Sequence, residues 1–239
     1  MTTAVSGCRV DLREPRRAEV RSGESVSFAV DLAVPEPWLE RPRLGREVRT
    51  IDGAGLPDLS WALELDRDTT VPALISGTAQ VRDTRIDVHT PSGFPDAGAG
   101  RGVEVAIAAS GVEVVYGHLA RGSTKSGLVR SGEAIGRGGN TGRCVDGCGK
   151  SFVSIELRGF RLSRSLDDVF TPIEVALYVE GKREGAAVRI SAGETQIRGL
   201  AVASFRPSRD RGDRLACEVR VTRRGSLLGS TRLDLAVRI

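Results

Sequence analysis

The sequence predicts a mostly β protein with an antiparallel β core, one or more flanking β-sandwich modules and one short helix. Three observations carry this prediction. Apolar and polar residues alternate over several short stretches, which is the period of half-buried strands. Glycine is abundant, with 29 residues in a chain of 239, and Gly, Ser and Pro separate the stretches as turn residues do. Aromatic residues make up only 4% of the chain.

The clearest element is a hairpin near the middle of the chain. Residues 103–108 alternate apolar and polar side chains, Ser110 and Gly111 form a turn, and residues 112–116 return as a second strand. Residues 152–157 form a later strand of the same core. This hairpin and the later strand define the centre of the fold.

Three segments follow from the distribution of strands and prolines. Residues 1–50 are predicted to be an N-terminal β segment and a proline-rich linker, and residues 51–182 the core domain. Residues 183–239 show repeated strand patterns with turns between them, which indicates a small β-sandwich module. The strand at 24–32 is a candidate to complete that sandwich.

The predicted helix rests on one short motif. Thr171, Pro172, Ile173 and Glu174 match a capping box with proline at the first helical position. The motif predicts a short helix that ends near Tyr178.

Composition excludes several classes of function. No run of 18 apolar residues exists, so the sequence predicts no transmembrane segment. The net charge is +4, but no basic block is interleaved with aromatic residues, so nucleic acid is not an expected partner. No signal peptide is visible at the start of the chain, so the compartment stays open. The bacterial envelope or the extracellular space is expected if the protein is exported.

The order of motifs across residues 59–157 resembles the M23 zinc metallopeptidases, the LytM-like cell-wall endopeptidases. That family carries a strand hairpin, a Tyr-x-His-Leu box, a glycine-rich segment and a His-x-His-x-Glu strand. In this sequence the matching pieces are Thr69-Thr70-Val71-Pro72-Ala73, Tyr116-Gly117-His118-Leu119, Val129, Ser131-Gly132-Glu133, Ile135-Gly136 and Gly138-Gly139-Asn140-Thr141-Gly142. The resemblance implies the LytM-like fold for the core domain.

The sequence departs from the family at the zinc ligands. Ser60 and Glu64 stand where the family has the His and Asp of its upstream His-x-x-x-Asp motif. Phe152 and Ser154 stand where the family has the two histidines of His-x-His, of which the second is a ligand. Only His118 matches a family catalytic residue. Catalytic zinc needs three protein ligands, so no metal and no other cofactor are expected.

Three interpretations of function follow. The first is a catalytically inactive LytM-like module that binds the cell wall (peptidoglycan) or regulates a cell-wall hydrolase. The second is a structural component of an envelope or phage-tail-like assembly, in contact with its other subunits. In this case Trp61 and Phe152 would fill the former groove. The third is a hydrolase with an atypical site that uses His118, Glu64, Glu156 or the cysteines.

The four cysteines leave three alternatives open. Cys144 and Cys148 enclose a short glycine-containing loop and could form a disulfide, with Cys8 and Cys217 as a second pair. All four could instead be free thiols. A third alternative places Cys144, Cys148 and His118 around a metal ion.

Overall fold

The computed structural model describes residues 7–48, 59–66, 68–83, 88–89, 102–144 and 151–238. The chain divides into two compact units. The sandwich unit combines Met1–Trp38 with Thr171–Ile239, and the inserted unit is the segment Leu39–Phe170 between them. Strands dominate both units, so the prediction of a mostly β protein is confirmed.

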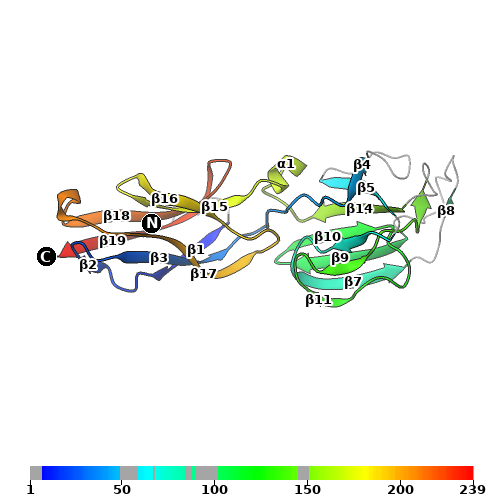
Figure 1. The fold of residues 1–239 in the computed structure, drawn as a ribbon, viewed down its shortest axis with the longest axis horizontal. Helices are drawn as coiled ribbons and strands as arrows, with labels where there is room; N and C mark the ends of the chain where they lie inside the picture. The colour runs from blue at the N-terminus through cyan, green and yellow to red at the C-terminus, as the bar shows by residue number, and fades with distance from the viewer. Residues whose placement is uncertain are drawn as a thin grey trace. The chain divides into compact units, whose positions relative to one another are not determined.

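The sandwich unit consists of two sheets to which both ends of the chain contribute. The first has the order β1-β3-β17 and the second the order β16-β15-β18-β19-β2. In Figure 1 the blue strands of the N-terminal segment lie beside the orange and red strands of the C-terminal segment. Its strands are β1 (Arg9–Glu14), β2 (Glu19–Arg21), β3 (Val26–Ala33), β15 (Ile173–Val179), β16 (Lys182–Arg189), β17 (Gln196–Phe205), β18 (Arg214–Arg223) and β19 (Ser226–Arg238), with a 3-10 turn η1 (Arg209–Arg211).

The core of the sandwich unit follows from alternation along its strands. In β3 the side chains of Val26, Phe28, Val30 and Leu32 are buried while the residues between them are more exposed. The ring of Phe28 stacks on that of Phe205 in β17, with 6.1 Å between centroids. The strand at 24–32 thus belongs to the same unit as the C-terminal strands.

The predicted helix at residues 172–178 is wrong, because this segment is strand β15. It pairs with β18 over its whole length and with β16 on its other side. Ile173, Val175, Leu177 and Val179 are all buried, and this alternation outweighs the capping motif at Thr171. An isolated helix of seven residues is marginal, whereas a central strand is hydrogen-bonded on both edges.

The helix that does occur is the short α1 (Leu166–Val169). Ser165 caps it, since its Oγ accepts a hydrogen bond from the backbone N–H of Asp168. The next residue, Phe170, ends the inserted unit. No helix in the described part of the chain is long and apolar enough to span a bilayer.

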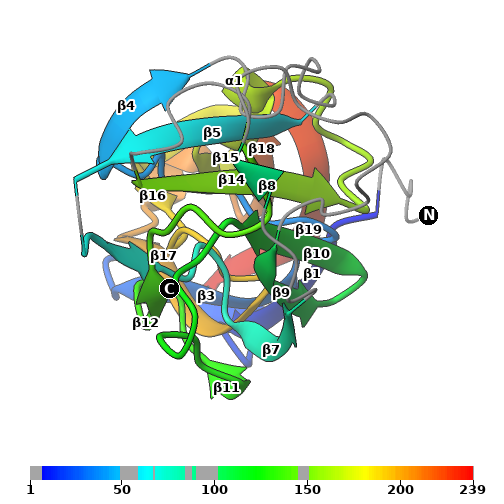
Figure 2. The same ribbon diagram turned by 90° about the vertical axis from the view of Figure 1, so that its right-hand side faces the viewer.

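The inserted unit is built on a seven-stranded sheet of order β11-β7-β9-β10-β14-β5-β4. Figure 2 shows β4, β5 and β14 side by side at one end of this sheet. The predicted hairpin at 103–116 and the strand at 152–157 are confirmed. The strands are β4 (Gly45–Val48), β5 (Ser60–Leu65), β7 (Gly77–Asp83), β9 (Val103–Ala109), β10 (Val112–Gly117), β11 (Gly127–Val129) and β14 (Ser151–Arg158), with smaller pairs β6 (Thr70–Pro72) with β12 (Ala134–Arg137) and β8 (Val88–His89) with β13 (Arg143–Cys144).

One face of the seven-stranded sheet forms the main apolar core. Alternate residues of the central strands, among them Tyr116, Ile155 and Leu63, pack there with Leu39. The hydroxyl of Tyr116 accepts a hydrogen bond of 2.6 Å from the backbone N–H of Leu74, and burial raises the pKa of Tyr116. The opposite face of the same sheet carries the residues that resemble a peptidase site.

The unit boundaries differ from the expected segments 1–50, 51–182 and 183–239. The chain passes between units at Trp38 and again at Phe170. Trp38 belongs to the sandwich unit, where its Nε1 donates to the carbonyl oxygen of Ile190 at 2.9 Å. The next residue, Leu39, is fully buried in the core of the inserted unit.

Candidate functional site

The register of β5 against β14 brings the predicted site positions to one face of the sheet. Phe152 lies opposite Glu64, Ser154 opposite Ala62, and Glu156 opposite Ser60. Side chains two residues apart in a strand share a face. The positions that match the upstream and downstream ligand motifs therefore lie together, on the face opposite the main core; we call it the site face.

His118 is next to this face, at the end of β10. Its neighbour Gly117 pairs with Ser154 of β14. His118 is 5% exposed and has a left-handed backbone, with φ of 65°. This conformation is uncommon for residues other than glycine and can mark a functional position. It also ends the alternation of side chains along β10.

Thr141 holds His118 in place. The carbonyl oxygen of Thr141 lies 2.8 Å from Nδ1 of His118. A carbonyl oxygen only accepts, so Nδ1 carries the proton in this contact. The Oγ1 of Thr141 donates to the carbonyl oxygen of Leu119 and accepts from the N–H of Val103. No role for Thr141 is predicted from the sequence, where the signal for this residue is its place in the glycine-rich run.

The residues at the matched positions do not fit a catalytic zinc ion. Neutral hydroxyls at Ser60 and Ser154 and a phenyl ring at Phe152 are not among the usual zinc ligands. Glu64 is an adequate donor type, but Arg46 of β4 donates to its Oε2 at 2.5 Å. Among the described residues no group of three His, Cys, Asp or Glu side chains could hold a metal ion. We therefore derive no chemistry through zinc.

The site face includes a buried hydroxyl for which the described residues supply no hydrogen-bond partner. Ser154 is 8% exposed, and its hydroxyl has no hydrogen-bond partner. A buried hydroxyl without a partner costs about 1–3 kcal/mol, so native proteins rarely keep one. Such a group is ready to bond an acceptor or donor supplied by a ligand.

Trp61 does not fill the site face, contrary to the expectation from the sequence. It lies on the opposite face of β5, in the main core, with its ring edge-to-face against Phe170 at 5.2 Å. The alternation of β5 decides this, since Trp61 sits between Ser60 and Ala62. Phe152 is on the site face and is 4% exposed. Its backbone N–H donates to the carbonyl oxygen of Gly139 at 2.6 Å.

The cysteine predictions have different outcomes. The pairing of Cys8 with Cys217 is wrong, because both are free thiols. Burial raises the pKa of each to about 11. The side chain of Cys144 and all of Cys148 lie outside the described residues, so their disulfide stays a prediction.

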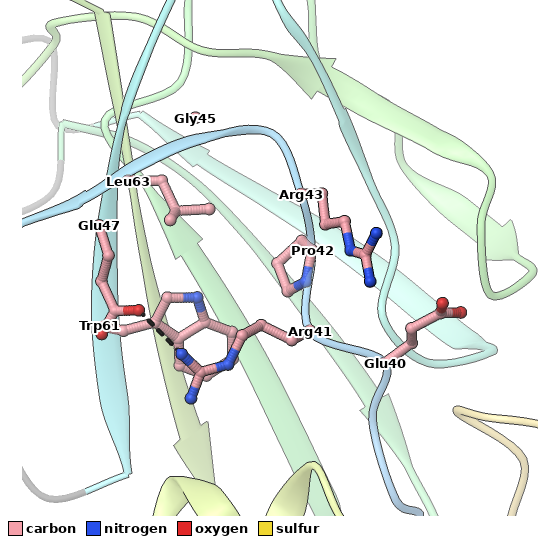
Figure 3. Close-up of a pocket in the computed structure, with 8 residues that line it drawn as sticks. All are labelled: Glu40, Arg41, Pro42, Arg43, Gly45, Glu47, Trp61 and Leu63. Atoms are coloured by element: carbon pink, nitrogen blue, oxygen red, sulfur yellow. Dashed lines mark hydrogen bonds and ion pairs between the residues drawn. The ribbon is translucent and has the colours of Figure 1, made fainter.

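A pocket of about 440 Å³ lies at the β4 edge of the sheet (Figure 3). Its lining comes from the segment before β4, from β4 itself and from the core side of β5. The residues are Glu40, Arg41, Pro42, Arg43, Gly45, Glu47, Trp61 and Leu63. None of these is predicted from the sequence to be a binding residue, because they come together only through the pairing of β4 with β5.

Comparison with known proteins adds no assignment: no family model, no curated protein and no solved structure matches the chain.

Proposed function

We propose that the inserted unit is a catalytically inactive LytM-like module that binds cell-wall peptides or regulates a cell-wall hydrolase. The site face takes a peptide segment of peptidoglycan and holds it without cleaving it. The sandwich unit provides further contacts to the wall or to a protein partner. The resemblance of the motifs across residues 59–157 to the M23 peptidases supplies the substrate class.

One observation carries this proposal. Two motifs about 90 residues apart in the sequence, at 60–64 and 152–156, pair strand against strand in β5 and β14. The end of β10 at Gly117, directly before His118, lies next to Ser154. A match of motifs arising by chance would have no reason to converge on one face. The replaced ligands then argue for binding without hydrolysis.

Binding is tested by co-sedimentation of the purified protein with insoluble peptidoglycan. Ser60 is only partly exposed, and an arginine side chain there would cover the site face. We expect Ser60→Arg to reduce the bound fraction at least tenfold. Ser126→Arg is the matched control, because Ser126 is exposed and precedes the opposite edge strand, β11. Equal binding by both variants and the unmodified protein would remove the site face from the proposal.

Turnover of peptidoglycan is measured in the same experiment, with and without a metal chelator. We expect no release of soluble peptides in either condition. Cleavage that the chelator stops, and that His118→Ala abolishes, would overturn the inactive interpretation. It would favour a hydrolase with an atypical site.

A further inference from the structure

The pocket at the β4 edge lies on the face of the sheet opposite the site face. Trp61 and Leu63 of β5 line it, and both belong to the main core. A ligand in this pocket would therefore not occupy the site face. Pockets of 300–1,000 Å³ are typical of small-ligand sites, and this one has about 440 Å³.

A buried hydrogen-bond donor without a partner borders this pocket. Trp61 is 3% exposed, and its Nε1 finds no acceptor. Figure 3 shows this ring nitrogen on the side of the indole that is turned toward Leu63 and Pro42. Buried tryptophan N–H groups are usually paired. The other tryptophan of the chain follows this rule, since Trp38 donates to Ile190.

Two arginines of the lining, Arg41 and Arg43, differ in the interactions that they make with other side chains. Arg41 pairs with Glu47 at 3.1 Å and with Asp167 at 3.9 Å, and its guanidinium stacks 4.7 Å from the ring centroid of Phe170. Arg43 is exposed and makes no ion pair with any described residue. The lining thus keeps two donors for a ligand: the buried N–H of Trp61 and the guanidinium of Arg43.

Two donors beside apolar walls select a particular ligand chemistry. A carboxylate only accepts hydrogen bonds and suits both an N–H and a guanidinium. Pro42 and Leu63 offer apolar surface for a short aliphatic chain. The lining contains two carboxylates, Glu40 and Glu47, which disfavour a ligand with several negative charges.

We propose that this pocket binds the carboxylate of an apolar monocarboxylic compound, either a peptide C-terminus or a small free acid. One carboxylate oxygen accepts from Nε1 of Trp61, and the other meets Arg43. Nε1 is fully covered without a ligand, so a side chain of the lining has to move when the carboxylate binds. The ligand supplies the acceptor that the folded chain lacks.

The test follows the indole N–H resonance of Trp61 by ¹⁵N-edited NMR in Trp38→Phe protein, which keeps Trp61 as its only tryptophan. The probes are N-acetyl-leucine and N-acetyl-leucinamide, which differ in the carboxylate alone. We expect the acid to shift the resonance downfield in a saturable titration and the amide to leave it in place. No shift with the acid, or equal shifts with both probes, would overturn the proposal.

Two variants locate the carboxylate. Arg43→Gln should weaken binding of the acid about tenfold, the usual effect of losing a charged hydrogen bond. Arg46→Gln is the matched control, because Arg46 lies three residues further along the chain, in β4, and pairs with Glu64; it should bind as before. Equal weakening by both substitutions would reduce the effect to general charge and contradict the site.

A third probe, the tripeptide Ala-Ala-Leu, separates the two sources of the carboxylate. Tighter binding than N-acetyl-leucine supports a peptide C-terminus, and equal or weaker binding supports a small free acid.

Discussion

The sandwich unit and the inserted unit both contain residues with left-handed backbones, but they use them differently. In the sandwich unit Glu180 and Arg224 have φ of 50°, and each is followed by a glycine that also has positive φ. Both form two-residue turns between adjacent antiparallel strands, the type I′ geometry of tight hairpins. Ser110 of the inserted unit has the same arrangement.

His118 and Leu59 of the inserted unit have no such explanation. Their φ values are 65° and 57°, and neither lies in a two-residue hairpin turn; the same holds for Asp68, with φ of 65° between β5 and β6. Leu59 directly precedes β5 and packs against the main core, whereas His118 directly follows β10, next to the site face. The buried unpaired groups of Trp61 and Ser154 lie in the same strands or their neighbours. Departures from local rules are expected where a protein binds or reacts, and these residues are where the binding surfaces proposed for the inserted unit can be tested.

The largest effect is expected for the loss of a buried ion pair in the sandwich unit. Arg223 and Glu36 are 7% and 2% exposed and lie 3.0 Å apart. Arg223→Met leaves the carboxylate of Glu36 buried beside an apolar chain. We expect the free energy of unfolding to fall by about 3 kcal/mol or more, measured by denaturant titration with circular dichroism.

Arg189→Met is the control for this prediction. The pair of Arg189 with Glu174 is exposed, so its loss should cost less than about 1 kcal/mol. Similar losses in both variants would show that burial of Arg223 contributes little.

The second prediction concerns the close contact between the backbone at Gly139 and the backbone of His118 and Ala120. A methyl group on Gly139 would lie 2.8 Å from the carbonyl oxygen of His118 and 2.6 Å from the N–H nitrogen of Ala120. Gly139→Ala must displace this backbone and should destabilise the inserted unit by about 2 kcal/mol. Fluorescence of Trp61 in a Trp38→Phe background follows this unit. Gly136→Ala is the control, because its new methyl group meets only side-chain atoms at 3.4 Å or more.

The third prediction separates backbone strain from side-chain function at His118. An L-residue in the left-handed region costs about 1 kcal/mol more than glycine. His118→Gly should therefore be about 1 kcal/mol more stable than His118→Ala, since both remove the imidazole. If the alanine variant is equally stable, the φ of 65° carries no strain and loses its value as a functional marker.

The smallest effect is a pH dependence that differs between the units. In the sandwich unit the backbone N–H of Gly199 donates to Asp31 and lowers its pKa from the ordinary 3.8. In the inserted unit a hydrogen bond from Lys125 lowers the pKa of Glu133 from the ordinary 4.5. A depressed carboxyl pKa contributes stability above its ordinary value and loses it as the pH falls.

The two carboxyls are tested one unit at a time. Asp31→Asn should flatten the acid-side fall in stability of the sandwich unit, and Glu133→Gln should do the same for the inserted unit. Thermal melts at several pH values between 3 and 7, read by the tryptophan of each unit, measure both. A change in the wrong unit would contradict the assignment of these contacts.

Local sequence determined the strands and the tight turns. The alternation at 103–108 and 112–116 and the Ser110-Gly111 turn were sufficient for the hairpin β9–β10, because alternation and turn chemistry act over a few residues. Local sequence did not determine the structure of residues 171–178. There the Thr-Pro-Ile-Glu motif and the alternation of Ile173, Val175 and Leu177 favoured different structures. Pairing with β18, distant in sequence, decided between them.

The sequence alone indicated a β protein and the positions at which it resembles a peptidase site. Tertiary structure decided which positions meet. The pairing of β5 with β14 placed Ser60, Glu64 and Ser154 on one face and turned Trp61 to the other. The return of residues 171–239 to the N-terminal strands made one sandwich from both chain ends. Which strands pair depends on the apolar surface that each pairing buries, and the partners can lie far apart in the sequence. A single sequence does not show which of the possible pairings is the most favourable.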